Sequence, residues 1–294
     1  GAVNLIFQFA YGPQKFEIGG ISLKNYGQTV SLPQFKTEYY YPGRGEANAA
    51  WRVAANDRIN QVRKGDLTVR VVDRDGNPLP GAQVLVQQTN HAFKFGSAVT
   101  AQLLAGNGQT AADREQYRSR VSSLFTTTVL ENDLKWPFWE EWTWNRQATM
   151  DTFVWLKNQN LTVRGHNLVW PASSNLPADA RNLTGNALKA RIDQHFADIL
   201  KPESAGGKCY QWDVVNETYT NYDVQGRIAG VPNVTASNGV LGQQEMVRWF
   251  QLARQLEPNT KLFINDYDIL AAGGQNVNQQ NYYYAVINWL LDNA

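Results

Sequence analysis

The pattern of apolar and polar positions divides the chain into two regions with different periodicity. Over residues 1–33 apolar and polar positions alternate in short runs, and Gly12-Pro13 and Gly19-Gly20 supply turns between them. This alternation predicts antiparallel strands, but two or three strands cannot bury a stable core alone. We therefore expect either the last strands of a β-sandwich or a cap packed on the next domain.

The next segment carries one helical and one hairpin pattern. Residues 47–62 place apolar side chains near helical spacing and predict a helix. Residues 67–72 and 82–86 alternate as strands, with turn-forming residues at 73–78 between them. The sequence therefore predicts a helix followed by a β-hairpin.

From Phe93 onward, short apolar runs alternate with longer segments of helical periodicity. Strands are predicted at 93–99, 125–131, 162–170, 211–217 and 261–266, and helices at 111–124, 146–160, 185–200, 243–256 and 277–293. Thr184 and Asn278 are candidate N-caps of the third and fifth helices. Such alternation favours parallel βα units. The pattern gives about five units where a closed barrel needs eight, so an open doubly wound sheet and an incomplete (β/α)8 TIM barrel both remain possible.

Composition narrows the function classes. Twenty-seven basic and twenty-six acidic residues among 294 give a net charge of +1, which argues against electrostatic binding of nucleic acid or a membrane surface. A single cysteine, Cys209, excludes an internal disulfide, and three histidines argue against a multi-histidine metal site. We expect no cofactor and no metal. The ten tryptophans suit either sugar stacking or a core, and the core is the better expectation for any one of them.

Polar side chains gather at the ends of four predicted strands, which in a parallel barrel is where chemistry lies. Glu217 follows the apolar run 212–215 beside Asn216, and acid-assisted cleavage of a glycosidic bond needs such a carboxylic acid. Each residue alone has a plainer interpretation. Glu131 and Lys135 could form a surface ion pair, His166 could be a core histidine, and Asp266 could cap a turn.

Joined in order, four strings resemble the motifs of glycoside hydrolase family 10, the endo-1,4-β-xylanases. They are Glu131-Asn132-Asp133-Leu134-Lys135-Trp136, Arg164-Gly165-His166-Asn167-Leu168-Val169-Trp170, Trp212-Asp213-Val214-Val215-Asn216-Glu217 and Asn265-Asp266-Tyr267-Asp268. The resemblance covers about residues 66–294 and implies a partial catalytic (β/α)8 barrel preceded by a β-hairpin. Residues 1–37 resemble the C-terminal strands of a β-sandwich carbohydrate-binding module, with 38–65 as a helical linker.

The resemblance implies roles for individual residues. Glu217 would be the general acid/base, and Asn216 would contact the 2-hydroxyl of the sugar being cleaved. Substrate binding would fall to Glu131, Asn132, Lys135, His166, Trp170, Asn175 and Tyr267, with Asp213 and Asp266 as supporting residues. The chain departs from the family motifs at Leu134, at Asp268 and at Pro171, which stands where a histidine is usual. Asn175 would then take the place of the family glutamine, with one residue inserted.

A retaining mechanism needs a second carboxylate about 5–5.5 Å from the first. The family carries it in a T-E-L-D-like motif on the seventh strand, and that motif does not occur in these residues. A five-unit barrel would also expose apolar strand edges. We therefore expect the nucleophile to lie beyond this chain and a further polypeptide segment to complete the barrel.

The sequence thus predicts a secreted, periplasmic or cell-surface endo-1,4-β-xylanase that acts on xylan or xylo-oligosaccharides by retaining double displacement. Two rivals remain: a non-catalytic xylan-binding protein and a cellulose-type β-1,4-glycanase. No nucleic-acid or membrane partner is expected.

Overall fold

The computed structural model describes residues 29, 48–89, 92–106, 108–230, 240–270 and 276–294, without the side chains of 240–243. The chain forms two compact units, residues 1–85 and 86–294. The strands predicted within residues 1–33 lie almost wholly outside the described residues. The module expected at 1–37 therefore stays a prediction.

In the first unit, helix α1 (Ala50–Val62) corresponds to the helix predicted at 47–62. It ends where the backbone N–H of Arg63 donates to the carbonyl of Ile59 at 2.9 Å. No residue within α1 is buried, and Trp51 is 47% exposed. The described residues of this unit therefore bury no face of α1. The role of the helix as a linker remains a prediction.

The β-hairpin prediction is only partly right. The turn forms: the Asp73 carboxylate accepts hydrogen bonds from the backbone N–H groups of Asp75 and Asn77, both at 2.9 Å. The two flanking strands do not form, and a single antiparallel bridge joins Val72 to Pro78. Side chains such as Leu67 and Leu85 are 69% and 94% exposed. A two-stranded ladder without a buried face is marginal in water, which explains the difference.

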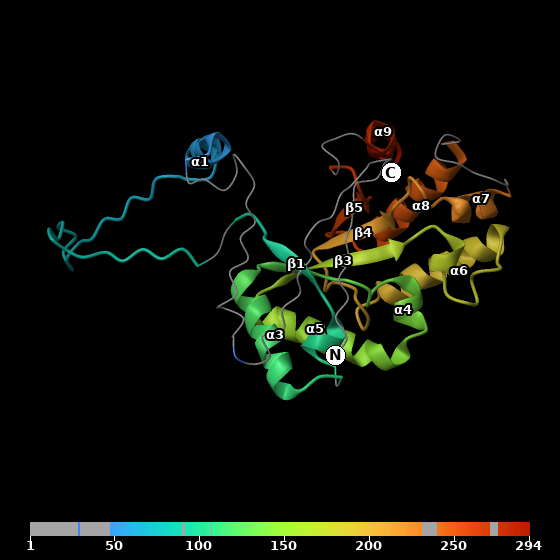
Figure 1. Ribbon diagram of the computed structural model, residues 1–294, viewed down its shortest axis with the longest axis horizontal. Helices are drawn as coiled ribbons and strands as arrows, with labels where there is room; N and C mark the ends of the chain where they lie inside the picture. Colours follow the sequence, from blue (N-terminus) through green and yellow to red (C-terminus); the bar gives the residue numbers. More distant parts are fainter. Residues whose placement is uncertain (1–28, 30–47, 90–91, 107, 231–239, 271–275) are drawn as a thin grey trace. The chain divides into compact units, whose positions relative to one another are not determined.

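The second unit is built on a five-stranded parallel sheet (Figure 1). Its strands correspond to the five predicted ones and are β1 (Gly96–Val99), β2 (Thr127–Leu130), β3 (Thr162–Val169), β4 (Gln211–Asn216) and β5 (Lys261–Asn265). Spatial order equals chain order. A doubly wound sheet reverses its strand order at a switch point. The observed order therefore favours the barrel-type arrangement over the open doubly wound alternative.

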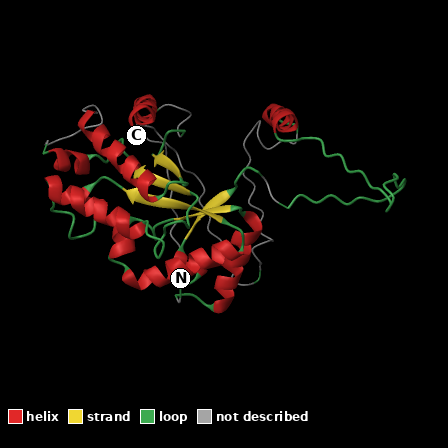
Figure 2. Cartoon of the chain, turned by 180° about the vertical axis from the view of Figure 1, so that it is seen from behind, coloured by secondary structure: helices red, strands yellow, loops and turns green. Residues whose placement is uncertain are grey.

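Helices follow the strands and lie outside the sheet, as the red and yellow elements of Figure 2 show. The long ones match the prediction: α3 (Ala111–Leu124), α5 (Thr143–Asn158), α6 (Gly185–Ile199), α8 (Val240–Leu256) and α9 (Val277–Asn293). Short elements were not predicted: α2 (Ala101–Leu104), α4 (Trp136–Glu140), the 3-10 turn Ser173–Asn175 and α7 (Asp223–Ala229). They span one or two turns, too short for a clear apolar period.

One of the two predicted N-caps is at the predicted residue. Thr184 is the N-cap residue of α6, although its side chain makes no capping hydrogen bond. The N-cap of α9 is Asn276 rather than Asn278. Its amide donates instead to the Gln279 side chain at 3.0 Å.

Large aromatic side chains fill the space between sheet and helices. Trp136, Trp139, Trp212 and Trp249 are each at most 2% exposed. Strand β3 approaches Trp212 of β4 so closely that a Cβ placed on Gly165 would lie 2.2 Å from the indole ring. Gly165 is therefore required for the packing of these two strands, and the core interpretation holds for these four tryptophans.

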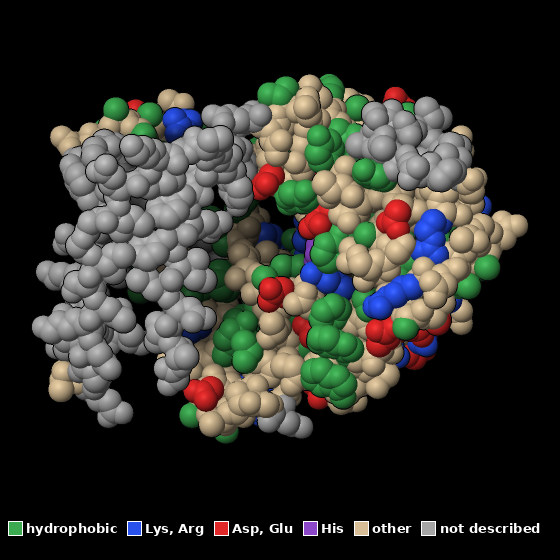
Figure 3. Space-filling view, turned by 45° about the vertical axis from the view of Figure 1, so that its right-hand side comes forward, with side chains coloured by type: hydrophobic (Ala, Val, Ile, Leu, Met, Phe, Trp, Pro, Cys, Tyr) green, Lys and Arg blue, Asp and Glu red, His purple; other side chains and the backbone are tan. Residues whose placement is uncertain are grey.

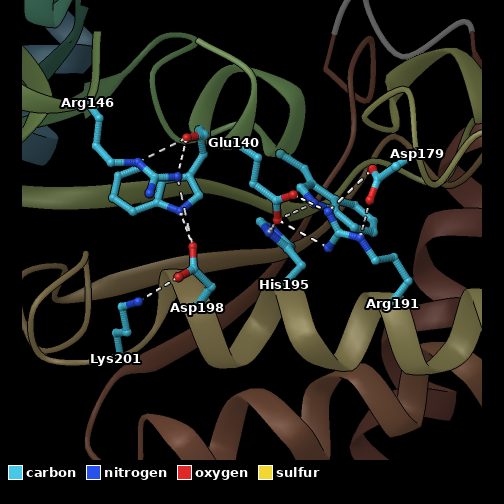
Figure 4. A network of polar contacts seen from close by, with 9 residues as sticks. Glu140, Arg146, Asp179, Arg191, His195, Asp198 and Lys201 are labelled. Carbon is cyan, nitrogen blue, oxygen red and sulfur yellow. Dashed lines mark hydrogen bonds and ion pairs between the residues drawn. The ribbon is translucent and has the colours of Figure 1, made fainter. Parts of the chain in front are cut away.

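A polar network ties α4 to α6 (Figure 4). Glu140 accepts hydrogen bonds from Trp136 Nε1 at 2.6 Å and His195 Nδ1 at 3.0 Å, and forms an ion pair with Arg191. Burial alone would raise the pKa of Glu140. The hydrogen bonds and charges of His195 and Arg191 have the larger effect and lower this pKa from 4.5 to about 2. Burial lowers the pKa of His195, so this imidazole is neutral near pH 7.

The surface of the molecule matches its balanced charge. Acidic and basic side chains are interspersed with hydrophobic ones over the coloured surface in Figure 3. Within the described ranges, every helix falls short of the length and apolar character needed to cross a bilayer.

Replacing Gly165 with alanine should destabilise the protein by about 1–3 kcal/mol, because the added methyl overpacks the buried Trp212 ring. Urea unfolding would measure the change. Gly108→Ala is the control, since a Cβ there meets no atom within 4 Å. Equal stability of both variants would contradict the close approach of the two strands.

Replacing Glu140 with glutamine should destabilise the fold at pH 7 by roughly 3 kcal/mol, given the pKa displacement from 4.5 to about 2. A carboxyl with a depressed pKa contributes stability above pH 4.5 that is lost as the pH falls toward 2. The deficit of the variant should therefore shrink in acid. Urea unfolding at pH 7 and pH 3, with the exposed Glu203→Gln as control, checks this; a deficit independent of pH would refute it.

Candidate active site

The candidate site lies where β2, β3, β4 and β5 end. Parallel pairing aligns Asn216 of β4 with Asn265 of β5, so the residues after both strands emerge together. Glu217 leaves β4 with a backbone φ of 55°, and its N–H donates to the carbonyl of Asn265 at 2.7 Å. A left-handed glutamate is uncommon and such backbone strain concentrates at functional sites. This turn at the strand end fixes where the carboxyl group leaves the sheet.

Glu217 is half-buried, and its surroundings raise the carboxyl pKa. Burial is the main cause and the negative charge of Asp266 adds to it, while Lys135, Asn216 and His166 act in the opposite direction. A raised pKa keeps more of the acid protonated near neutral pH. That is the property a proton donor needs.

Lys135 connects Glu217 with the residues after β2. Its Nζ donates to Asn132 Oδ1 at 2.8 Å and lies 5.0 Å from the centroid of the Trp170 ring. Burial lowers the pKa of this ammonium group, while the charges of Glu217 and Glu131 raise it. The structure thus brings the predicted residues of the β2 end together with Trp170 of the β3 end.

A buried carboxylate holds His166 in place. Asp213 is 2% exposed. Its Oδ2 lies 2.9 Å from His166 Nδ1 and accepts a hydrogen bond from Arg164 Nε at 3.1 Å. A hydrogen bond between His166 Nδ1 and Asp213 fixes the orientation of the imidazole ring. The supporting role expected of Asp213 stays a prediction. Arg164 was not named among the site residues, although its place two residues before His166, on the same face of β3, could have indicated it.

Asn216 is buried and oriented by its neighbour. Asn265 Nδ2 donates to Asn216 Oδ1 at 2.8 Å, and the Asn216 side chain also forms a hydrogen bond with Glu217. Asn265 is a second positioning residue that sequence reasoning missed. The equivalent register of the two asparagines at strand ends is the signal that could have found it.

Asp266 and Tyr267 follow β5. Asp266 accepts backbone N–H bonds from Tyr219 at 3.1 Å and Tyr267 at 2.9 Å, so the turn-capping interpretation of this residue is correct. Burial raises its pKa. Tyr267 is 41% exposed, and its hydroxyl lies 3.4 Å from Thr220 Oγ1. Asp266 also acts on Glu217 through its negative charge.

The loop after β2 is anchored from below by Asp133. This carboxylate, 6% exposed, accepts from the backbone N–H of Ala101 at 3.0 Å and from the Asn145 side chain. It therefore joins the loop to α2 and α5. Sequence reasoning gave Asp133 no role, although it lies inside the E-N-D-L-K-W string.

A pocket of about 220 Å³ opens beside these residues. Lys135, Asn167, Trp170 and Asn175 line it, so Asn175 does face the same space as the predicted binding residues. The indole Nε1 of Trp170 is buried and has no hydrogen-bond partner among the described residues. The site thus combines a proton donor, a cation, amides and aromatic walls, a set suited to sugar hydroxyls and ring faces.

Comparison with known proteins identifies related chains. The model of glycosyl hydrolase family 10 matches residues 85–293. Endo-1,4-beta-xylanase 3 of Hypocrea jecorina is 28% identical over 77% of this chain and 60% of its own length. The anti-sigma-I factor RsgI6 of Acetivibrio thermocellus is 29% identical over 74% of this chain and 26% of its own. The chain therefore spans between about a quarter and three-fifths of these relatives.

Solved structures agree on the fold. Xylanase 10B of Thermotoga petrophila, solved with xylobiose, is 22% identical with a TM-score of 0.52, covering 68% of this chain and 56% of that one. At this identity the likeness concerns the fold alone. It assigns the five βα units to part of a (β/α)8 barrel, as the sequence predicts.

Two charge-removing variants should move the pKa of Glu217 in opposite directions. Asp266→Asn removes a nearby negative charge and should lower it, whereas Lys135→Met removes a positive charge and should raise it. A ¹³C NMR titration of the Glu217 carboxyl, assigned by comparison with Glu217→Gln, measures both shifts. Displacements of the same sign would show that these charges do not act on Glu217 as described.

Proposed function

Because the chain belongs to glycosyl hydrolase family 10, we propose that the intact protein is an endo-1,4-β-xylanase that cleaves xylan with retention of configuration. The observation that carries the proposal is Glu217. It stands half-buried at the end of β4, with a raised pKa, between the charges of Lys135 and Asp266. Relatives of this chain named as endo-1,4-beta-xylanases support the choice of substrate.

Glu217 acts first as an acid and then as a base. In the first step its proton passes to the glycosidic oxygen as the bond from that oxygen to the anomeric carbon breaks, while a carboxylate attacks the anomeric carbon. Lys135 then stabilises the ionised Glu217 that remains. In the second step Glu217 takes a proton from water, whose oxygen displaces the carboxylate from the sugar.

The attacking carboxylate needs to lie about 5–5.5 Å from the acid. Asp213 is engaged by Arg164 and His166, and Asp266 by two backbone N–H groups. Charge-assisted bonds of this kind lower the nucleophilicity of a carboxylate, so we assign neither residue this role. The proposal rests on Glu217 alone.

Substrate binding is assigned to the groups around the acid. The Asn216 side chain, oriented by Asn265 and hydrogen-bonded to Glu217, suits the sugar 2-hydroxyl, and His166 with Trp170 forms the wall of the cleavage subsite. Glu131, Asn132, Lys135 and Asn175 contact the sugars on one side, and the exposed Tyr267 contacts those on the leaving-group side. None of these roles uses a metal or an organic cofactor. A polymeric substrate of this kind also favours a site of action outside the cytoplasm.

We further propose that additional polypeptide pairs with the outer edges of β1 and β5. Within the described residues each of these strands has one neighbour, whereas a closed barrel pairs both edges. A groove of about 620 Å³ lined by Leu262, Ile264 and Ile287 lies beside β5 and has the apolar lining that a packed βα unit would cover.

The second candidate is xylan binding without hydrolysis. One observation favours this alternative. A similar domain also occurs in a protein that is named as an anti-sigma-I factor and not as a hydrolase. In that case the aromatic and amide groups would bind the polysaccharide while Glu217 would transfer no proton.

Glu217→Gln should lower the hydrolysis rate of xylan by the intact protein by about 10²–10⁴-fold, since it removes the transferred proton, while binding of xylotriose changes little. Reducing-sugar release and calorimetric titration measure the two effects. Glu115→Gln, an exposed exchange on α3, is the matched control.

An unchanged rate in Glu217→Gln would remove this residue from the mechanism. Retardation of the unmodified protein in a xylan affinity gel, with no reducing sugar formed, would favour the binding protein over the enzyme. Faster release from carboxymethyl-cellulose than from xylan would instead favour the cellulose-type glycanase.

A further inference from the structure

Three aromatic side chains lie in contact where α4 gives way to α5. The rings of Phe138 and Trp142 are 4.1 Å apart between centroids, and those of Trp142 and Trp144 are 5.7 Å apart and nearly parallel. Trp142 is 41% exposed and Trp144 is 65% exposed. Trp144 therefore has one face on its neighbour and presents much of the remaining ring to solvent.

This exposure contrasts with the other tryptophans of the unit. Trp136 and Trp139, which precede the pair on α4, are at most 2% exposed. Scattered exposed apolar side chains are common and need no explanation, but adjoining ones mark interaction sites. The outer face of the Trp144 indole, supported from behind by Trp142, is a flat apolar surface of a kind that binds flat apolar ligand faces.

The aromatic pair is continuous with the candidate active site. Trp142 lines the same pocket as Lys135 and Trp170. Lys135 in turn is linked electrostatically to Glu217. A chain-like ligand that passes Glu217 and enters this pocket would reach Trp142 and then Trp144.

The pair is also held rigidly. The carbonyl of Trp142 accepts the backbone N–H of Asn145 at 2.8 Å as α5 begins. Asn145 is buried and bonded to Asp133, and the Arg146 guanidinium donates to the carbonyl of Trp139 at 3.2 Å. A preformed surface loses little conformational entropy on binding.

Three charged side chains line the pocket, and each has a hydrogen-bond partner. Glu141 is bonded to the backbone N–H of Ala178, Arg181 donates to the carbonyl of Leu176 at 2.9 Å, and Lys135 donates to Asn132 Oδ1 at 2.8 Å. Because all three are engaged, none of them presents an unpaired charge to a ligand. The surroundings therefore suit an uncharged ligand with many hydroxyl groups and apolar C–H faces.

We propose that Trp142 and Trp144 form an additional sugar-binding platform, which takes further xylose units of the polysaccharide beyond those contacted by Lys135 and Trp170. The C–H faces of the pyranose rings lie against the indole surface and their hydroxyls stay in water. This inference rests on the proposed function and extends it to longer substrates.

Calorimetric titration of the chain with xylotriose, xylotetraose, xylopentaose and xylohexaose tests the platform. Affinity of the unmodified chain should rise with length. Trp142→Ala and Trp144→Ala should remove most of that rise, roughly 3- to 30-fold for the longest ligand, and leave xylotriose affinity unchanged. Trp144→Phe should keep much of it. Trp51→Ala, another exposed tryptophan located in the first unit, is the control and should alter nothing.

A rise in affinity with length that persists in both alanine variants would overturn the platform while leaving the proposed function intact. Failure of the unmodified chain to bind xylotriose would overturn the proposed function and this inference together. The unfolding midpoint of Trp144→Ala, measured alongside, should equal that of the unmodified chain because this side chain is 65% exposed, so that variant keeps the test free of a folding defect.

Discussion

The site depends on the parallel pairing of consecutive strands. Since β2 to β5 run in the same direction and in chain order, the residues that follow them emerge at one edge of the sheet. Groups as distant in sequence as Lys135, His166 and Asp266 therefore act on a single carboxyl group. A shift of one strand by one residue would turn its polar side chains to the other face. Close packing of Gly165 against Trp212 opposes such a shift between β3 and β4.

Two buried carboxylates fix the positions of side chains and loops at the strand ends. Burying a charge costs free energy unless donors surround it. Asp213 is satisfied by Arg164 and His166, and Asp133 by a backbone N–H and Asn145. Each acid therefore binds only one arrangement of its donors well. Asp213 fixes the imidazole, and Asp133 fixes the loop that carries Lys135. At Glu217 the nearby donors do not fully offset burial, so the pKa of this carboxyl is raised.

Sequence reasoning succeeded where the signal is periodic or local. All five strands of the second unit and its long helices lie where apolar periodicity predicts them, with α3 at the same residues. The predicted site residues are mostly brought together, because motif order and parallel pairing suffice for that. It failed where tertiary context decides. The strands at 67–72 and 82–86 lack a surface to bury them, and short helices such as α4 owe their form to buried anchors such as Trp136. The positioning roles of Arg164 and Asn265 follow from a cross-strand partner that no single strand reveals.

Lys135 belongs to two environments at once, because it adjoins both Glu217 and the Trp170 wall of the pocket. A sugar hydroxyl that bonds to this ammonium group draws on the same positive charge that lowers the pKa of Glu217. Occupancy of the pocket and the proton affinity of the acid are consequently linked, and by reciprocity each changes the other by the same free energy. Under the proposed function, Glu217 therefore holds its proton with different strength when the pocket is empty and when a saccharide occupies it.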